Sequence, residues 1–325
     1  MTEPLPVGVV GVGALGRHHA RHYARMHGAS LVGVYDADHA RAAQVAVEVG
    51  CAAFLSLEDL LGAVQAVSIA VPTSFHRDVG LECLGRGIAV LMEKPLAVTL
   101  DEADELLGEA ARHGVVFAVG HVERFNRAVR AAQQVLVNPH FLEGIRLAPF
   151  QPRGTDVAVV LDLMIHDLDL ANHLVGGAPA TDVRANGVSV LSPHLDMVNA
   201  RVEFEGGVVA SMTASRVARE RVRRLRVFQS SGYISIDLAA GSGSFMRLRE
   251  GWRPGSGASI EEIVETIPLT APEADALGLE LAAFVAAVRR EPAAIVTAIE
   301  GRAALALALE VTAAVQRSPQ PVLGR

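Results

Sequence analysis

One lysine stands out among the residues that could do chemistry. The chain has 29 basic residues, and Lys94 is the only lysine among them, all the others being arginine. A GC-rich genome would explain the general use of arginine, but not why one lysine is kept. An ammonium group can lose its proton near neutral pH when its surroundings lower its pKa, whereas a guanidinium cannot. We therefore expect Lys94 to have a chemical role rather than a structural one.

A second group of polar residues lies on a predicted apolar helix over 158–175. Asp162 and His166 are four residues apart, so an α-helix places them on one face. The ordinary explanation is a core histidine whose neighbours make all its hydrogen bonds, but buried polar groups are costly without such partners. Oxidation of an alcohol needs a base, and histidine can serve near neutral pH. Asp162 could orient the imidazole or contact a substrate.

A glycine-rich motif near the N-terminus predicts a dinucleotide site. Residues 11–16 match G-x-G-x-x-G between a predicted strand over 6–11 and a predicted helix over 14–27. In that setting Gly11 permits a tight turn, Gly13 lets the backbone approach a diphosphate, and Gly16 lets the helix pack closely. Ala14 and Leu15 complete the loop at the helix N-terminus, where anions bind favourably.

The choice of dinucleotide depends on Asp36, which lies 20 residues after Gly16 at the end of a second predicted strand. A carboxylate in that place accepts hydrogen bonds from ribose hydroxyls and repels a 2′-phosphate. The following Ala37-Asp38 offers no cation, although Arg41 is nearby. These residues favour NAD over NADP.

Further candidates for the cofactor site follow other predicted strands, because strand carboxyl ends line the ligand crevice of such sheets. Pro72, Thr73 and His76 follow one strand, and Glu93 and Lys94 follow another. Thr73 could instead only cap the next helix. Glu93 could equally be a surface carboxylate.

Composition limits the other functional classes. The 325 residues suit two domains, and the net charge of −7 argues against nucleic-acid binding. Two cysteines without metal-ligand spacing suit a cytoplasmic protein, and no secretion signal or apolar run of about 18 residues predicts export or a membrane span. We expect no metal, because His18, His19 and His22 have no evident carboxylate or cysteine partner.

The elements that would position these residues form two expected domains. Strands alternate with amphipathic helices up to Gly120, which predicts a doubly wound parallel α/β Rossmann domain over 1–120. Residues 121–325 read as an α/β domain with an open, mainly antiparallel sheet over about 180–250 and helices over 123–137, 276–290 and 297–317. An open sheet must cover its second face, so a homodimer or homotetramer is expected.

The motifs together resemble the Gfo/Idh/MocA oxidoreductase family over nearly the whole chain. The resemblance rests on GVGALG at 11–16, EKP at 93–95, GHVERFN at 120–126 and DLMIHDLDL at 162–170, in the family order. It implies NAD-dependent oxidation of a sugar or cyclitol hydroxyl, with Lys94, Asp162 and His166 as the catalytic group. Either Lys94 or His166 could accept the proton.

The finer similarity is to the branch that oxidises nucleotide sugars, the UDP-N-acetylglucosamine 3-dehydrogenases, whose product passes to an aminotransferase. Arg127 departs from that branch, which commonly has proline there. By analogy, His121, Glu123, Arg124 and Asn126 would line the substrate site, and Arg153 could meet a diphosphate. Oxidation of a free sugar or inositol, or a dinucleotide sensor without chemistry, are the alternatives.

An arginine-rich segment from Arg216 to Arg226 has two interpretations. It could contribute to an anionic substrate site, or it could be a solvated strand face or a subunit contact. The second interpretation is favoured, because alternating charges are usual on the open face of a strand.

Overall fold

The computed structural model describes residues 3–151, 157–251 and 259–318. The chain divides into two compact units, the first made of residues 1–122 and 274–305, and the second of 123–273 and 306–325. Helix α10 (Ala298–Arg317) is shared, with its residues up to Leu305 in the first unit.

The first unit is built on a parallel sheet whose strand order within the described residues is β3-β2-β1-β4-β5-β6. This is the order of a dinucleotide-binding Rossmann fold. The strands are β1 (Leu5–Val10), β2 (Ala29–Tyr35), β3 (Ala52–Ala53), β4 (Ala66–Ile69), β5 (Ala89–Glu93) and β6 (Phe117–Gly120). The continuous burial of β4, β5 and β6 fits strands covered on both faces. The predicted fold class is confirmed.

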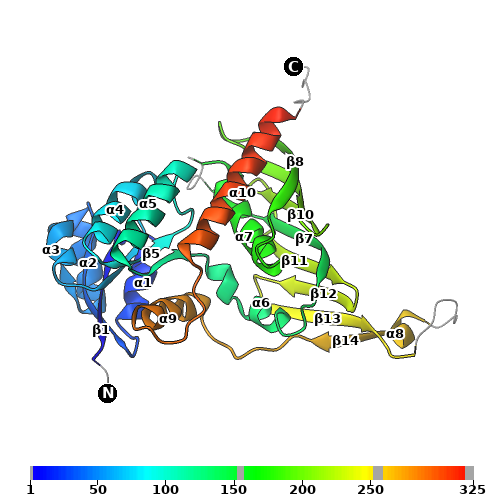
Figure 1. The fold of residues 1–325 in the computed structure, drawn as a ribbon, viewed down its shortest axis with the longest axis horizontal. Helices are drawn as coiled ribbons and strands as arrows, with labels where there is room; N and C mark the ends of the chain where they lie inside the picture. The colour runs from blue at the N-terminus through cyan, green and yellow to red at the C-terminus, as the bar shows by residue number, and fades with distance from the viewer. Residues whose placement is uncertain (1–2, 152–156, 252–258, 319–325) are drawn as a thin grey trace. The chain divides into compact units, whose positions relative to one another are not determined.

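Helices follow these strands along the chain. They are α1 (Gly16–Tyr23), α2 (His39–Val49), α3 (Leu57–Leu61), η1 (Thr73–Phe75), α4 (His76–Gly85) and α5 (Leu100–His113). Side chains cap three of them: Asp38 caps α2, Ser56 caps α3, and Thr99 forms a capping box with Glu102 at the start of α5. Helices α4 and α5 lie side by side (Figure 1).

The expected boundary between the domains differs from the structure in one respect. The sequence pattern places residues 274–305 in the second domain, whereas in the structure they belong to the first unit. Helix α9 (Ala276–Val288) places Leu281 and Phe284 in one buried cluster with Val7 and Tyr23. The apolar periodicity of α9 shows that it is buried, but not which sheet it covers.

The second unit contains a sheet with the order β14-β13-β12-β11-β7-β10-β9-β8 in the described residues. Its strands are β7 (Pro139–Leu147), β8 (Ala180–Val188), β9 (Met197–Phe204), β10 (Val209–Ser215), β11 (Val222–Gln229), β12 (Gly232–Asp237), β13 (Ser242–Leu248) and β14 (Val264–Pro268). Neighbours are antiparallel except the β7–β10 pair. The predicted mainly antiparallel sheet is confirmed.

The helices of this unit correct two local predictions. The expected helix over 123–137 is a short η2 (Val122–Phe125) followed by α6 (Arg127–Ala132), because Asn126 starts a new helix by capping α6. The expected continuous α-helix over 158–175 is a π-helical turn, η3 (Val160–Met164), leading into α7 (Ile165–Leu174). Helix α7 packs on β7 and β10 (Figure 1). A four-residue helix, α8 (Ile260–Ile263), precedes β14.

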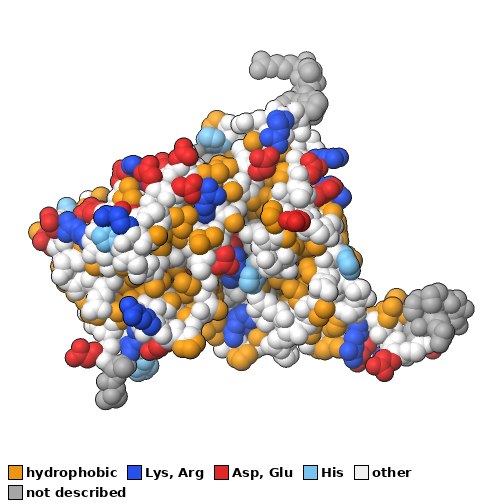
Figure 2. Space-filling model, in the orientation of Figure 1, with side chains coloured by type: hydrophobic (Ala, Val, Ile, Leu, Met, Phe, Trp, Pro, Cys, Tyr) orange, Lys and Arg blue, Asp and Glu red, His pale blue; other side chains and the backbone are white. Residues whose placement is uncertain are grey.

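The surface shows no large region of one charge on the face drawn in Figure 2, where acidic and basic side chains are interspersed. Exposed ion pairs between helices include Arg77–Glu105 and Arg302–Asp104. Among the residues that the structure describes, no helix is long and apolar enough to cross a membrane.

Candidate functional site

The glycine loop joins β1 to α1 with little room for side chains. Gly11 has φ +81°, and a Cβ there would lie 2.8 Å from the carbonyl oxygen of Ala70. A Cβ on Gly16 would lie 1.8 Å from the carbonyl oxygen of Gly11, so only glycine lets α1 approach the loop this closely. A Cβ on Gly13 would meet nothing within 4 Å, because this residue faces open space.

The N-terminus of α1 fits the diphosphate of a dinucleotide. Ala14 and Leu15 are exposed in the loop. No side chain caps this end, and no acidic residue lies in the first turn. No side chain of α1 therefore offsets the positive end of the helix dipole, which leaves this helix end favourable for an anion.

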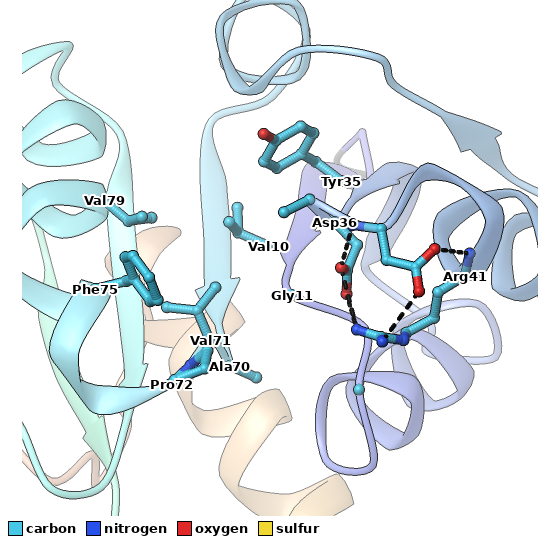
Figure 3. A pocket seen from close by; sticks show the side chains of 13 residues that line it. Val10, Gly11, Tyr35, Asp36, Arg41, Ala70, Val71, Pro72, Phe75 and Val79 are labelled. Carbon is cyan, nitrogen blue, oxygen red and sulfur yellow. Dashed lines mark hydrogen bonds and ion pairs between the residues drawn. The ribbon is translucent and has the colours of Figure 1, made fainter.

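A pocket of about 620 Å³ opens beside this loop (Figure 3). Its walls come from the carboxyl ends of β1, β2 and β4, which is where such sheets bind their ligands. Asp36 and Arg41 line one side and Val71 and Phe75 the other. The lining residues are Val10, Gly11, Gly13, Tyr35, Asp36, Ala37, Asp38, Arg41, Ala70, Val71, Pro72, Phe75 and Val79.

Asp36 is held rigidly in this pocket. Its Oδ2 accepts the backbone N–H of Val12 at 2.8 Å, and its Oδ1 accepts that of Asp38 at 2.9 Å. The side chain is 8% exposed. The carboxylate therefore shapes the glycine loop as well as facing the pocket.

His76 lies behind the pocket wall rather than in it. It is buried, its Nδ1 lies 2.9 Å from the carbonyl oxygen of Pro95, and its Nε2 lies 3.0 Å from that of Val71. Burial lowers the pKa of His76 although the backbone carbonyls act in the opposite direction. His76 thus connects the Pro72–Thr73 segment with the turn after Lys94.

Glu93 ends β5, the strand next to β4, and Lys94 follows directly after it. Glu93 is buried, and its Oε1 lies 2.9 Å from His19 Nε2. Its Oε2 accepts the backbone N–H of Lys94 at 3.3 Å, and the Lys94–Pro95 peptide bond is cis. From the sequence, His19 stands out only as an unsupported metal ligand, whereas in the structure it is a partner of Glu93. Among the described residues, no cluster of three His, Cys, Asp or Glu side chains suits a metal.

In the second unit, Asp162 lies in the π-helical turn and His166 in the first turn of α7. Both are half-buried, whereas Asp167 and Asp169 on the same helix are buried. A π-turn is rare and is common at functional sites. It changes the helical phase between Asp162 and His166 from the α-helical one that the sequence suggested.

Two buried arginines fix α7 in place. Arg124 binds both carboxylate oxygens of Asp169, at 2.7 and 2.8 Å. Arg146 binds Asp167 in the same bidentate way, at 2.9 and 2.8 Å, and reaches Glu123 at 3.0 Å. Burial raises the pKa of Asp167, although Arg146 opposes this. Sequence reasoning missed Arg146 and Asp167, since no motif contains both.

The residues expected to line a substrate site are placed as follows. Glu123 and Arg124 take part in these buried ion pairs. Asn126 caps α6 and donates from Nδ2 to the carbonyl oxygen of Leu238 at 2.8 Å. His121 is buried at the end of the first unit, after β6. Arg153 lies outside the described residues.

The arginine-rich segment is not uniformly solvated. Arg216 is buried, binds Asp196 Oδ1 at 2.8 Å, and donates to the carbonyl oxygen of Val157 at 2.7 Å. Arg226 pairs with Glu143 at 2.8 Å on the half-exposed side of β7. The favoured interpretation of a solvated face is therefore wrong for Arg216, which supports the segment leading into η3.

Comparison with known proteins agrees with this geometry. Residues 5–121 match the NAD-binding Rossmann-fold domain of the Gfo/Idh/MocA oxidoreductases, and residues 147–235 match the C-terminal domain of that family. A UDP-N-acetylglucosamine 3-dehydrogenase from Acidithiobacillus ferrooxidans is 40% identical over 310 residues, which is 95% of this chain and 96% of that protein. The chain belongs to the Gfo/Idh/MocA oxidoreductase family.

Two further similarities complete the comparison. The solved structure of the A. ferrooxidans UDP-N-acetylglucosamine 3-dehydrogenase superposes with a TM-score of 0.90 at 39% identity, covering 97% of this chain and 98% of that one. A scyllo-inositol 2-dehydrogenase (NAD(+)) from Bacillus subtilis is 29% identical over 67% of this chain and 69% of its own. The chain is an NAD-dependent dehydrogenase that acts on CH–OH groups.

Proposed function

We propose that the chain oxidises the C3 hydroxyl of UDP-N-acetylglucosamine, or of a closely similar UDP-N-acetylhexosamine, to a ketone. The observation that carries this proposal is the 40% identity, over 95% of the chain, to a protein of that activity. The inositol dehydrogenase relative is less similar and matches a smaller share of the chain, 67%. The sugar nucleotide is therefore the favoured substrate, and a free sugar or cyclitol is the alternative.

The cofactor is held by the first unit in this proposal. The Gly11–Gly16 loop and the N-terminus of α1 receive the diphosphate, Asp36 receives the adenosine ribose, and Pro72 and Thr73 border the cofactor. The open space at Gly13 and the uncapped helix end support this assignment. Bound NAD supplies the oxidant, because its nicotinamide accepts a hydride from the substrate carbon.

Lys94, Asp162 and His166 act on the reacting hydroxyl. His166 accepts the hydroxyl proton, as an imidazole can. Lys94 donates a hydrogen bond to the same oxygen and stabilises its developing negative charge. Asp162 orients the imidazole or contacts the sugar. The ion pairs of Arg124 and Arg146 support this role, because they fix α7 and with it His166.

The ketone product of this reaction would be a suitable substrate for an aminotransferase. A ketone at C3 is the kind of carbonyl that an amino group replaces, so we propose a partner aminotransferase acting on this product. The compartment is suggested by the two cysteines. Cys51 and Cys83 are free thiols in the structure, which suits a reducing compartment, and we propose the cytoplasm.

The test is NADH formation by the purified protein with four substrates. We expect absorbance from NADH with UDP-N-acetylglucosamine and none with N-acetylglucosamine, glucose or myo-inositol. Reaction only with a free sugar or with inositol would refute the sugar-nucleotide assignment while leaving the dehydrogenase chemistry intact. Mass spectrometry of the product, after reduction with borodeuteride, would place the label at C3.

A further inference from the structure

The arginines of β11 divide between the two faces of the second sheet. Arg223 lies directly opposite Arg146 of β7 in the strand pairing. The guanidinium of Arg146 binds a carboxylate of α7, so both side chains point to the face on which α7 packs. Arg224 and Arg226 alternate with Arg223 and point to the other face, where Arg226 pairs with Glu143. A solvated face or a subunit contact can account for Arg224 and Arg226, but not for Arg223.

Among the described residues, Arg223 has no carboxylate to itself. Its Nη1 lies 3.8 Å from Glu123 Oε1, which is longer than a hydrogen bond. That oxygen already accepts a hydrogen bond from Arg146 Nη1 at 3.0 Å. The second oxygen, Oε2, accepts one from Asn126 Nδ2 at 3.1 Å. Glu123 is thus engaged by other partners, and the charge of Arg223 is only weakly compensated.

The surroundings of Arg223 are positively charged. Burial lowers the pKa of Arg223, and the opposed charge of Arg146 lowers it further. Arg221, two residues earlier, acts in the same direction, whereas Glu123 and Asp167 oppose it. Three guanidinium groups thus share two carboxylates, which leaves one unit of positive charge. Like charges opposite one another destabilise a sheet, and such unfavourable arrangements are common where a ligand binds.

This charge is accessible to a ligand. The side chain of Arg223 is 39% exposed, and Arg221 is exposed. The planar fork of a guanidinium matches two oxygens of a phosphate group. Helix α7, which carries His166, packs on the same face of the sheet. An anion at Arg223 would therefore lie on the face that also presents the proposed base.

We propose that Arg223, with Arg221 beside it, binds the diphosphate of a sugar-nucleotide substrate. Arg223 contacts the phosphate oxygens directly, and Arg221 adds attraction at longer range. A diphosphate supplies the negative charge that balances the opposed guanidinium groups of Arg146 and Arg223. This inference rests on the proposed function, because a free sugar or inositol has no phosphate to bind.

The experiment measures binding of UDP and of uridine to the full chain, saturated with NADH, by isothermal titration calorimetry. The parent protein should bind UDP more tightly than uridine, because only UDP has the diphosphate. Arg223→Ala should lower the affinity for UDP roughly tenfold to a hundredfold and leave that for uridine unchanged. Arg223→Lys should recover part of the loss, because it keeps the charge without the planar fork. Arg221→Ala should have a smaller effect, which added salt removes.

Arg224→Ala is the matched control for Arg223→Ala. Arg224 is exposed on the same strand and carries the same charge, but it points to the other face. Its removal should leave the affinity for UDP unchanged. Urea unfolding separates a ligand role from a structural one. Arg223→Ala should not lower the free energy of unfolding, because it removes the repulsion from Arg146.

Several results would overturn the inference. One is a parent protein that binds UDP no more tightly than uridine, and another is an unchanged affinity for UDP in Arg223→Ala. Equal losses in Arg223→Ala and Arg224→Ala would show a general effect of charge. Loss of both UDP and uridine binding in Arg223→Ala, together with a lower free energy of unfolding, would show a structural role.

The proposed function can fail separately from this inference. If UDP binding depends on Arg223 but UDP-N-acetylglucosamine is not oxidised, the diphosphate site stands and the sugar assignment is wrong. If UDP-N-acetylglucosamine is oxidised and its KM is the same in Arg223→Ala as in the parent protein, the proposed function stands and the diphosphate site is wrong.

Discussion

At the scale of single residues, the only lysine of the chain gives the sharpest prediction. Lys94→Ala and Lys94→Arg should both lower kcat by roughly a thousandfold, within the range expected for a group that assists proton transfer in the transition state. Arginine should not rescue activity, because its planar, larger guanidinium does not place a donor where the compact ammonium of lysine does. Steady-state kinetics measures kcat, and NADH titration should show that each variant still binds the cofactor.

His166→Ala should lose turnover to a similar degree, and a matched control is available. His140→Ala changes an exposed histidine at the start of β7 and should keep the normal rate. Near-normal kcat in Lys94→Ala or in His166→Ala would contradict the assigned roles. A rate recovered by Lys94→Arg would show that a fixed positive charge suffices there.

Residue-level prediction from the sequence worked best where the chemistry is local. The turn at Gly11, the close packing at Gly16 and the position of Asp36 at the end of β2 all depend on neighbours along the chain. The ion pairs of α7 do not, since Arg146 is 21 residues from Asp167 and Arg124 is 45 from Asp169. The sequence therefore suggested Arg124 as a substrate ligand, while the structure shows its guanidinium bound to Asp169.

At the scale of elements, periodicity identified the helices but not their details. The apolar residues over 158–175 fall on most faces of a helix, so their pattern does not distinguish an α-helix from one that begins with a π-turn. The same pattern in α9 did not reveal that this C-terminal helix completes the first unit. Both features depend on packing partners that are far away in the sequence.

The segment that leads into η3 depends on Asp196. Burial alone would raise the pKa of Asp196, but hydrogen bonds from Arg216, Ser192 and the N–H groups of Val190 and Leu191 lower it well below the ordinary value of 3.8. A lowered folded-state pKa means that the charged form stabilises the fold. This contribution is fully present above the ordinary pKa and is lost as the pH falls below it.

Asp196→Asn should therefore lower the free energy of unfolding by about 3 kcal/mol near neutral pH, because Arg216 is left with a buried charge and no carboxylate. Urea unfolding at a series of pH values from neutral to acidic measures this free energy. Below about pH 4 the free energy of unfolding should fall less steeply in the variant than in the parent protein. Asp182→Asn, at an exposed pair with Arg184, is the control. Equal pH slopes for the Asp196 variant and the parent would contradict the role of Asp196.

At the scale of the whole molecule, the second sheet bears on assembly. Helix α7 packs against one face of this sheet. Along β7, buried residues alternate with less buried ones, and the less buried residues point to the other face. On that other face Phe228 stacks near Phe141 and Tyr233, with ring centroids 5.8 and 4.8 Å away. Phe228 is 40% exposed although it lies within a strand. We propose that a second copy of this chain covers this aromatic cluster in a homodimer or homotetramer.

Phe228→Asp should shift the purified protein to monomer, because a carboxylate would have to be buried among aromatic rings in the interface. Light scattering coupled to size exclusion measures the mass. Val47→Asp is the matched control, since it places the same charge at an exposed apolar residue of α2, which is 85% exposed. NADH affinity should not change in Phe228→Asp, because the cofactor residues belong to the first unit. An unchanged mass with intact folding would mean that this face is not the contact between copies, and that its aromatic cluster is stable in water.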